Sequence, residues 1–446
     1  MSYVENKAGA FLFYFFNAKI KPVTMVYLLI FYFLLYTLLA VKNIRYAIYW
    51  LIFSLPAYQV RFDVFSLPMT LLEGEILLLF IVWLAGSLKN KTFKLPSKNT
   101  ILYFSILIFL LAATVSVFIS PDLKAAAGIW KAYFIEPILF LIVFVSSFKK
   151  ENLKDIFHIL ATQSLLLSLF AIYQKITGAF ITNPFWTDEA TRRVTGPFSY
   201  PNALALYLAP LIILLFGHLT LNFKNKISTI FYSAVILFSN LAVYFTGSKG
   251  ALLAILVGII FYALFFIGHR KKFIWLLIII LLLTGFYIFT KGLPDLNGTA
   301  SVEGGDSVST RLDMWSETWQ MLQNNFLFGA GLAGYQSAVA PYHAKDYIEV
   351  YLYPHNIIFN FWSETGLIGL LAFILIIICF YKTGFKKTNR ENYSLHVIAM
   401  SAMTTLLIHG LVDVPYFKND LAILFWFIIG IILILEKNNI YIKKYE

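Results

Sequence analysis

Charged residues and cysteines are scarce in this chain of 446 residues. Only 13% of the residues are charged, 60% are hydrophobic, and the mean hydropathy is +0.76. A soluble domain carries about 25% charged residues, so the composition excludes an ordinary soluble fold. The single cysteine, Cys379, lies in an apolar run and excludes both an intrachain disulfide and a site with several thiolate ligands.

Nucleotide, metal and signal motifs are also missing. No G-x-x-x-x-G-K-[ST] is present, which excludes a P-loop ATPase. The stretch GAGLAG at 329–334 matches G-x-G-x-x-G but follows an amphipathic pattern instead of a strand, which indicates a turn. Without an Asp-x-Asp pair or a Cys/His cluster, we expect neither a metal nor a cofactor. The start, MSYVENKAGAFLFYFF, lacks a basic region and a small-residue cleavage site, so we expect no removable signal peptide.

Long apolar runs are what the sequence has in abundance. A helix of about 20 residues crosses the hydrocarbon core of a bilayer, and lipid requires every spanning segment to satisfy its own backbone hydrogen bonds. We therefore predict an all-α polytopic membrane protein with about 12–13 transmembrane helices in a single membrane domain over 1–446. A further span beginning within 10–18 is left open. The predicted spans are 24–41, 46–57, 72–88, 99–119, 127–147, 156–176, 203–221, 227–245, 250–268, 273–290, 356–381, 394–412 and 420–436.

The net charge of +12 is distributed in a way that favours topology signals over a nucleic-acid surface. Lysines and arginines gather in every second loop, as expected of cytoplasmic loops under the positive-inside rule. We therefore expect no nucleic-acid partner, with membrane lipids as the surroundings. The loops assigned to the outer side are 58–70, 120–126, 177–202, 246–249, 291–354 and 413–419.

The longest outer loop, 291–354, contains an amphipathic pattern. Its segment TRLDMWSETWQMLQNN places Leu312, Trp315, Trp319 and Leu322 at steps of three and four residues. This spacing predicts a helix that lies on the membrane surface or across a cavity. A long loop of this kind is typically functional.

Two arginine motifs lie in the outer loops. The stretch TRRVTGPFSYPN at 191–202 leads directly into an apolar run, and Arg311 stands at the head of the amphipathic segment. Interfacial anchoring or a solvated helix end would account for such arginines. The positive-inside rule, however, disfavours arginine on this side, and a guanidinium beside a helix N-terminus is well suited to phosphate.

A histidine marks the point where the long outer loop re-enters the membrane. The sequence YPHN at 353–356 is followed by an apolar helix that contains Glu364. A histidine at such an interface is most often structural. An acid within an apolar helix favours a functional reading, and imidazole exchanges protons near neutral pH.

Taken in order, these stretches resemble the O-antigen ligase and O-antigen polymerase superfamily of bacterial envelope glycosyltransferases. The resemblance spans about residues 50–435. Its pieces are RVTGPFSYPN (193–202), TGSKGA (246–251), RLDMW (311–315), FLFGAG (326–331), PHN (354–356), ETGLIG (364–369) and HGLVD (409–413). One departure is Lys249, where the family often has arginine. Lysine keeps the positive charge but cannot bind a phosphate through two parallel N–H groups as a guanidinium does.

The resemblance implies a metal-independent, inverting transferase with a fold like that of class C glycosyltransferases. The implied partners are a glycan donor on undecaprenyl pyrophosphate and an acceptor hydroxyl on a glycan, lipid or cell-wall component, at the outer face of the bacterial cytoplasmic membrane. Its implied catalytic residues are His355, Arg311 and Arg193, and its implied substrate-binding residues are Arg192, Asn202, Lys249, Asn356 and Glu364. Ligase and polymerase are not separated by the sequence. A flippase or transporter for lipid-linked oligosaccharides and a non-catalytic scaffold remain as alternatives.

Overall fold

The computed structural model describes residues 22–64, 67–91, 99–266, 307–343, 350–386 and 388–442. Within these ranges, ten helices are long and apolar enough to span a membrane, which confirms the predicted all-α, multi-pass class. They are α2 (Pro22–Lys42), α4 (Leu71–Lys89), α5 (Thr100–Ile119), the continuous α6 (Leu123–Ile129), η3 (Trp130–Ile135) and α7 (Glu136–Ser147), α8 (Leu153–Thr177), α9 (Pro201–Leu221), α10 (Lys226–Phe245), α11 (Lys249–Phe266), α15 (Ile357–Gly384) and α17 (Asn419–Ile442).

Two further helices belong to the same bundle. The predicted span 46–57 is a ten-residue helix, α3 (Ile44–Phe53), followed by the short turn η2 (Leu55–Gln59). The predicted span 394–412 is α16 (Arg390–Gly410), which is less apolar than the others and packs against α9, α11 and α17. The predicted span 273–290 and the possible start within 10–18 lie outside the described residues.

The helix ends follow local sequence signals. Thr70 and Glu73 form a reciprocal capping box at the start of α4, and Asn225 caps α10 by accepting from the Ser228 N–H. Gly178, in the left-handed region at φ +71°, ends α8, and Pro201 occupies the first position of α9. The loops that meet the helices at these residues are therefore held at defined points.

Burial separates an inner from an outer set of helices. Almost the whole of α17 and most of α9 are buried, whereas α2, α5 and α10 expose many large apolar side chains. Exposed apolar residues on long helices are the surface that lipid covers. α9 and α17 thus form the interior against which the loops of one end are fixed.

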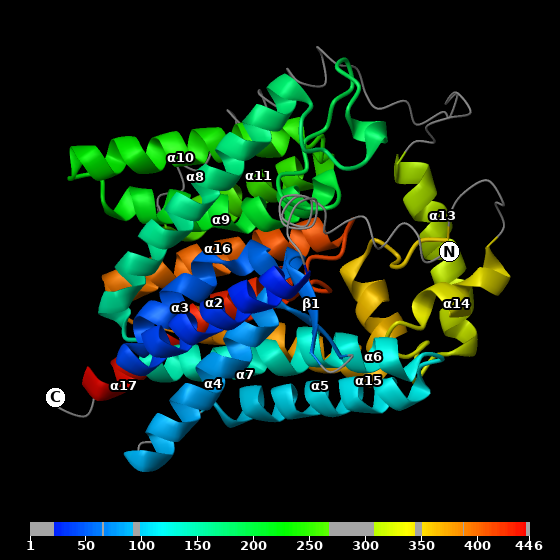
Figure 1. Cartoon of the computed structure of the whole chain (residues 1–446), viewed down its shortest axis with the longest axis horizontal. Helices are drawn as coiled ribbons and strands as arrows, with labels where there is room; N and C mark the ends of the chain where they lie inside the picture. Colours follow the sequence, from blue (N-terminus) through cyan, green and yellow to red (C-terminus); the bar gives the residue numbers. More distant parts are fainter. Residues whose placement is uncertain are drawn as a thin grey trace.

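The bundle has two ends of different charge. At the basic end, α5 and α15 meet through a hydrogen bond from Asn99 Nδ2 to Thr383 Oγ1. The described basic residues near this end are Lys42, Arg45, Lys89, Lys91, Lys149, Lys150, Lys154, Lys224, Lys226, Lys382, Lys386, Arg390 and Lys437. The opposite, loop end carries the hairpin β1 (Arg61–Val64) and β2 (Leu67–Thr70), and α13 (Ser307–Asn324) and α14 (Tyr335–Val339) lie across it (Figure 1).

α13 is the predicted amphipathic helix, and half of the predicted stripe lies in its packed face. Leu322 is buried, as are Met314 and Met321, and Trp315 Nε1 donates to the Pro354 carbonyl at 2.9 Å. Leu312 and Trp319, the other two residues of the stripe, are 56% and 44% exposed. The packed face lies against α14 and the start of α15, so the neighbouring elements determine which apolar residues of the helix are covered.

Candidate functional site

The turn Leu411–Asp413, between α16 and α17, gathers residues from three distant segments at the loop end. The Leu411 carbonyl accepts from Asn356 Nδ2 at 3.0 Å, and the Val412 carbonyl accepts from Arg311 Nε at 2.8 Å. Asp413 accepts from Asn202 Nδ2 at 3.0 Å through Oδ2 and faces His355 Nδ1 at 3.2 Å through Oδ1. We call this turn, with His355, Arg311, Asn202 and Arg193, the polar cluster.

Asp413 and His355 form a pair at the centre of the cluster. The Asp413 side chain is 4% exposed and that of His355 is 27% exposed. Burial alone would raise the pKa of Asp413, but the hydrogen bond and charge of His355, with a smaller effect of His409, hold the pKa well below its usual range. An ionised Asp413 at Nδ1 orients the imidazole and leaves Nε2 as the nitrogen for proton exchange.

The backbone of His355 is itself unusual. Its φ is +46°, a left-handed conformation that costs free energy in a residue with a side chain. The next residue, Asn356, caps α15 by accepting from Ile358 N–H at 2.9 Å and Phe359 N–H at 3.1 Å. The cap and the bond from Asn356 to Leu411 hold this turn, so the position of His355 is fixed from its C-terminal side.

Arg193 joins the cluster from the loop before α9. Its Nε donates to the Thr246 carbonyl at 2.7 Å, and its Nη2 donates to Asn202 Oδ1 at 3.1 Å. Gly247 lies directly under the guanidinium, since a Cβ built there would be 3.0 Å from Nε at a φ of +69°. Asn202 therefore links Arg193 to Asp413, and the predicted motifs at 193–202 and 246–251 meet at one point.

The two arginines Arg193 and Arg311 bring positive charge together. Burial lowers the pKa of Arg193, and the nearby charge of Arg311 lowers it further. The two described hydrogen bonds of the Arg193 guanidinium go to neutral oxygens, a backbone carbonyl and a side-chain amide. Like charges held close in a partly buried site favour an anion between them.

Lys249 lies beside this cluster without entering it in the described contacts. It begins α11 and is exposed. The preceding residue, Ser248, has its Oγ 3.5 Å from His409 Nε2, and a Cβ on Gly250 would meet Val412 at 2.7 Å. The segment thus packs against the turn Leu411–Asp413, with Lys249 at its open side.

Arg192 and Glu364, both predicted to bind substrate, make other contacts. Arg192 donates from Nη1 to the carbonyls of Lys175 at 2.9 Å and Ile176 at 3.2 Å, which closes the end of α8. Glu364 is fully buried in α15 and accepts from the Ala333 N–H at 2.7 Å through Oε2. Their predicted roles remain untested, but the structure gives both a structural task.

Glu364 belongs to a close backbone contact between the segments 327–333 and 363–367, which we call the glycine contact. Ala330 N–H donates to the Ser363 carbonyl at 2.7 Å, and Leu367 N–H donates to the Leu327 carbonyl at 3.0 Å. A Cβ on Gly329 or Gly366 would lie 2.3 or 2.4 Å from a backbone oxygen across this contact. The predicted turn at 329–334 is thus confirmed, and the glycines serve backbone packing.

Asp413 is the residue of the cluster that the predicted site lacked. The sequence contained a signal for it, because Asp413 ends the HGLVD motif on the predicted outer side. The motif alone did not indicate a role for a carboxylate next to a predicted phosphate site. Its importance follows only from the fold, which brings it to His355 from a position 58 residues along the chain.

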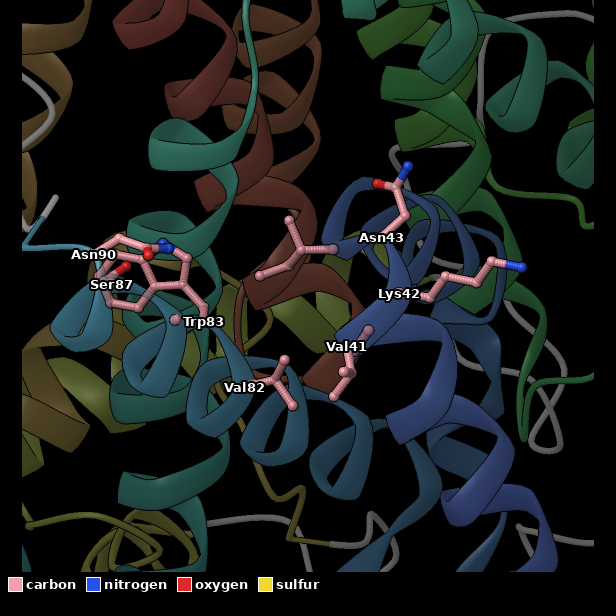
Figure 2. Close-up of a pocket in the computed structure, with 10 residues that line it drawn as sticks. Val41, Lys42, Asn43, Val82, Trp83, Ser87 and Asn90 are labelled. Carbon is pink, nitrogen blue, oxygen red and sulfur yellow. The ribbon is translucent and has the colours of Figure 1, made fainter.

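A cavity of about 330 Å³ lies at the other end of the bundle. It opens between the ends of α2 and α4, with Val41 and Val82 on facing helices and Trp83, Ser87 and Asn90 along α4 (Figure 2). None of the predicted site residues lines it. The cavity therefore belongs to a region separate from the polar cluster.

Comparison with known proteins finds a match over part of the chain. Residues 232–374, about a third of the sequence, match the family model described as O-antigen ligase. The match confirms the predicted resemblance to the O-antigen ligase superfamily over this segment. The matched segment contains Lys249, Arg311, His355, Asn356 and Glu364, whereas Arg193, Asn202 and Asp413 lie outside it. No curated protein matches the chain.

Proposed function

We propose that the protein transfers a glycan from undecaprenyl pyrophosphate to an acceptor hydroxyl, with inversion at the anomeric carbon and without a metal. The O-antigen ligase match supports a transferase of this general kind. The observation that carries the finer proposal is that Arg311 and the His355–Asp413 pair meet at one turn, to which Asn202 links Arg193. This set supplies positive charge for a leaving pyrophosphate and a base for an attacking hydroxyl.

The arginines act on the leaving group. As the bond between the anomeric carbon and the pyrophosphate oxygen breaks, negative charge grows on the pyrophosphate. Arg193 and Arg311, each held through Nε by a backbone carbonyl, keep guanidinium N–H groups in fixed directions for that charge. Preorganised donors of this kind typically contribute about 10²–10³ in rate each.

His355 acts on the nucleophile. The acceptor oxygen forms the new bond to the anomeric carbon, and its proton passes to His355 Nε2. Asp413, on Nδ1, stabilises the imidazolium that results. The products are the lengthened glycan and undecaprenyl pyrophosphate, and the proton leaves His355 afterwards.

The charges at the two ends support an outward-facing site in the bacterial cytoplasmic membrane. The basic end fits the cytoplasmic side, since lysine and arginine are retained there. The polar cluster lies at the loop end, opposite the lysine-rich turns that follow α2, α4 and α9. The lipid-linked donor and the acceptor would meet at that face.

The test is transfer by the purified protein in liposomes that contain undecaprenyl-pyrophosphate oligosaccharide and an acceptor glycan. We expect turnover that persists in EDTA, is lost in His355→Ala and Arg311→Ala, and yields the inverted anomer. The two variants should keep the thermal unfolding profile of the wild type. Transfer that survives both substitutions would overturn the site, and lipid translocation without transfer would favour a flippase.

A further inference from the structure

Lys418, five residues after Asp413, occupies an aromatic enclosure at the edge of the polar cluster. Its Nζ lies 4.7 Å from the ring centre of Phe198, 5.2 Å from that of Tyr58 and 5.4 Å from that of Tyr200. All three distances are within the range of cation–π attraction. The rings come from η2 and from the loop that connects Arg193 to α9, so one ammonium contacts two separate segments.

The ammonium of Lys418 is buried without a hydrogen-bond acceptor among the described residues. Burial lowers the pKa of Lys418 and Arg61 lowers it further, while the charges of Asp420 and Asp413 oppose that shift. A buried ammonium ordinarily has an acceptor for each N–H, and leaving them unmet costs free energy. This energetically unfavourable ammonium lies next to the proposed transfer site.

The rings around Lys418 determine where the arginine loop lies. Phe198 and Tyr200 are within four residues of Asn202, and Phe198 also stacks on Tyr58 with ring centres 6.4 Å apart. Asn202 in turn holds Arg193 Nη2 at 3.1 Å and Asp413 at 3.0 Å. A shift of this loop would move the amide that connects the two.

We propose that Lys418 is a positioning residue for the transfer reaction, whose ammonium holds the Phe198–Tyr200 segment against η2 and so fixes Asn202 and Arg193 for the donor pyrophosphate. This inference rests on the proposed function. Lys418 acts through the loop and does not touch the reacting atoms. Its loss therefore weakens donor binding and, because Arg193 also meets the leaving pyrophosphate, slows the bond-breaking step.

The test is steady-state transfer with the reconstituted full chain, with KM for the lipid-linked donor and kcat measured separately. Lys418→Met keeps the length of the side chain and removes its charge. We expect KM to rise by about tenfold and kcat to fall by about threefold or more. Lys418→Arg, which keeps a cation over the rings, should stay within about threefold of wild type in KM.

Two further variants separate positioning from general stability. Lys124→Met removes a lysine that is exposed at the same end and should leave KM unchanged. Tyr58→Leu should raise KM, and combining it with Lys418→Met should give little more than Lys418→Met alone, because both disrupt one contact. If Lys418→Met does not fold, the positioning role is tested with Phe198→Leu, for which we also expect a raised KM.

The outcomes are distinct. An unchanged KM in a folded Lys418→Met or Phe198→Leu protein, a fall in melting temperature as the only effect, or a loss of kcat without a change in KM would each overturn the positioning role. Absence of transfer by the wild type would instead overturn the proposed function.

Discussion

The polar cluster and the glycine contact each contain a buried acid, yet the two acids have different partners. Asp413 accepts the backbone N–H of Val414 but also faces two side chains, the imidazole of His355 and the amide of Asn202. Glu364 accepts a backbone N–H from Ala333 in a tight turn. Side-chain partners can move or exchange protons during a reaction, whereas a backbone partner holds a turn in place.

The comparison shows that an acid inside an apolar helix is not sufficient evidence of a reaction site. Both acids occupy segments that resemble the ligase superfamily, and both are almost fully buried. The difference lies in what the fold brings to them. A cluster of ionisable and polar side chains favours chemistry at Asp413, and a close backbone contact favours a packing role at Glu364.

The largest difference should appear when each acid is replaced by its amide. Asp413→Asn removes the charge that stabilises imidazolium at His355, so we expect kcat to fall by roughly 10²–10⁴. Glu364→Gln should change kcat by less than about threefold in protein that remains folded. The measurement is transfer in liposomes, and equal losses in the two variants would end the distinction between the regions.

For stability, we expect the larger effect from a substitution in the glycine contact. Gly366→Ala adds a Cβ 2.4 Å from the Leu327 carbonyl at a φ of +69°, so the contact must open. We expect a destabilisation of roughly 3 kcal/mol, seen as a lower melting temperature in detergent. Gly86→Ala is the matched control, because its Cβ would meet nothing within 4 Å. A melting temperature for Gly366→Ala equal to that of the control would contradict the close contact.

The neighbouring arginines extend the comparison to a pair one residue apart. Arg193→Lys keeps a charge but loses the fork that binds phosphate through two N–H groups, and we expect the specificity constant kcat/KM to fall about tenfold or more. Arg192→Lys should lower the melting temperature, since three carbonyls lose a donor, and leave kcat/KM within about threefold. The opposite ranking in kcat/KM would exchange the roles of the two residues.

Much of this architecture is predictable from sequence because lipid imposes simple rules. Apolar runs of sufficient length must be helices, and capping residues such as Thr70 and Asn225 mark where they begin. The candidates His355, Arg311 and Arg193 were predicted from their motifs and from the side of the membrane. The structure brings His355 and Arg311 to one turn and links Arg193 to it through Asn202.

What the sequence could not supply was the set of partners. The pairing of Asp413 with His355, the carbonyls that bind Arg192 and the face of α13 that packs all depend on contacts between distant segments. Periodicity predicts that α13 has a packed face, but only its neighbours decide which face it is. For the same reason, the sequence assigned both Arg192 and Arg193 to the substrate, whereas the fold bonds the Arg192 guanidinium to three backbone carbonyls.

The smallest expected effect concerns pH, and it tests the state of Asp413 directly. The pKa of Asp413 is held well below its usual range, so its ionised form stabilises the folded protein. This contribution is complete above the unfolded-state pKa of about 3.9 and disappears as the pH falls through the lower folded-state value. The difference in melting temperature between wild type and Asp413→Asn should therefore shrink as the pH falls below about pH 4. A difference that already closes between about pH 7 and 5 would mean that folded Asp413 takes up a proton there. The pKa of Asp413 would then be raised by burial, as in a buried acid without a charged partner.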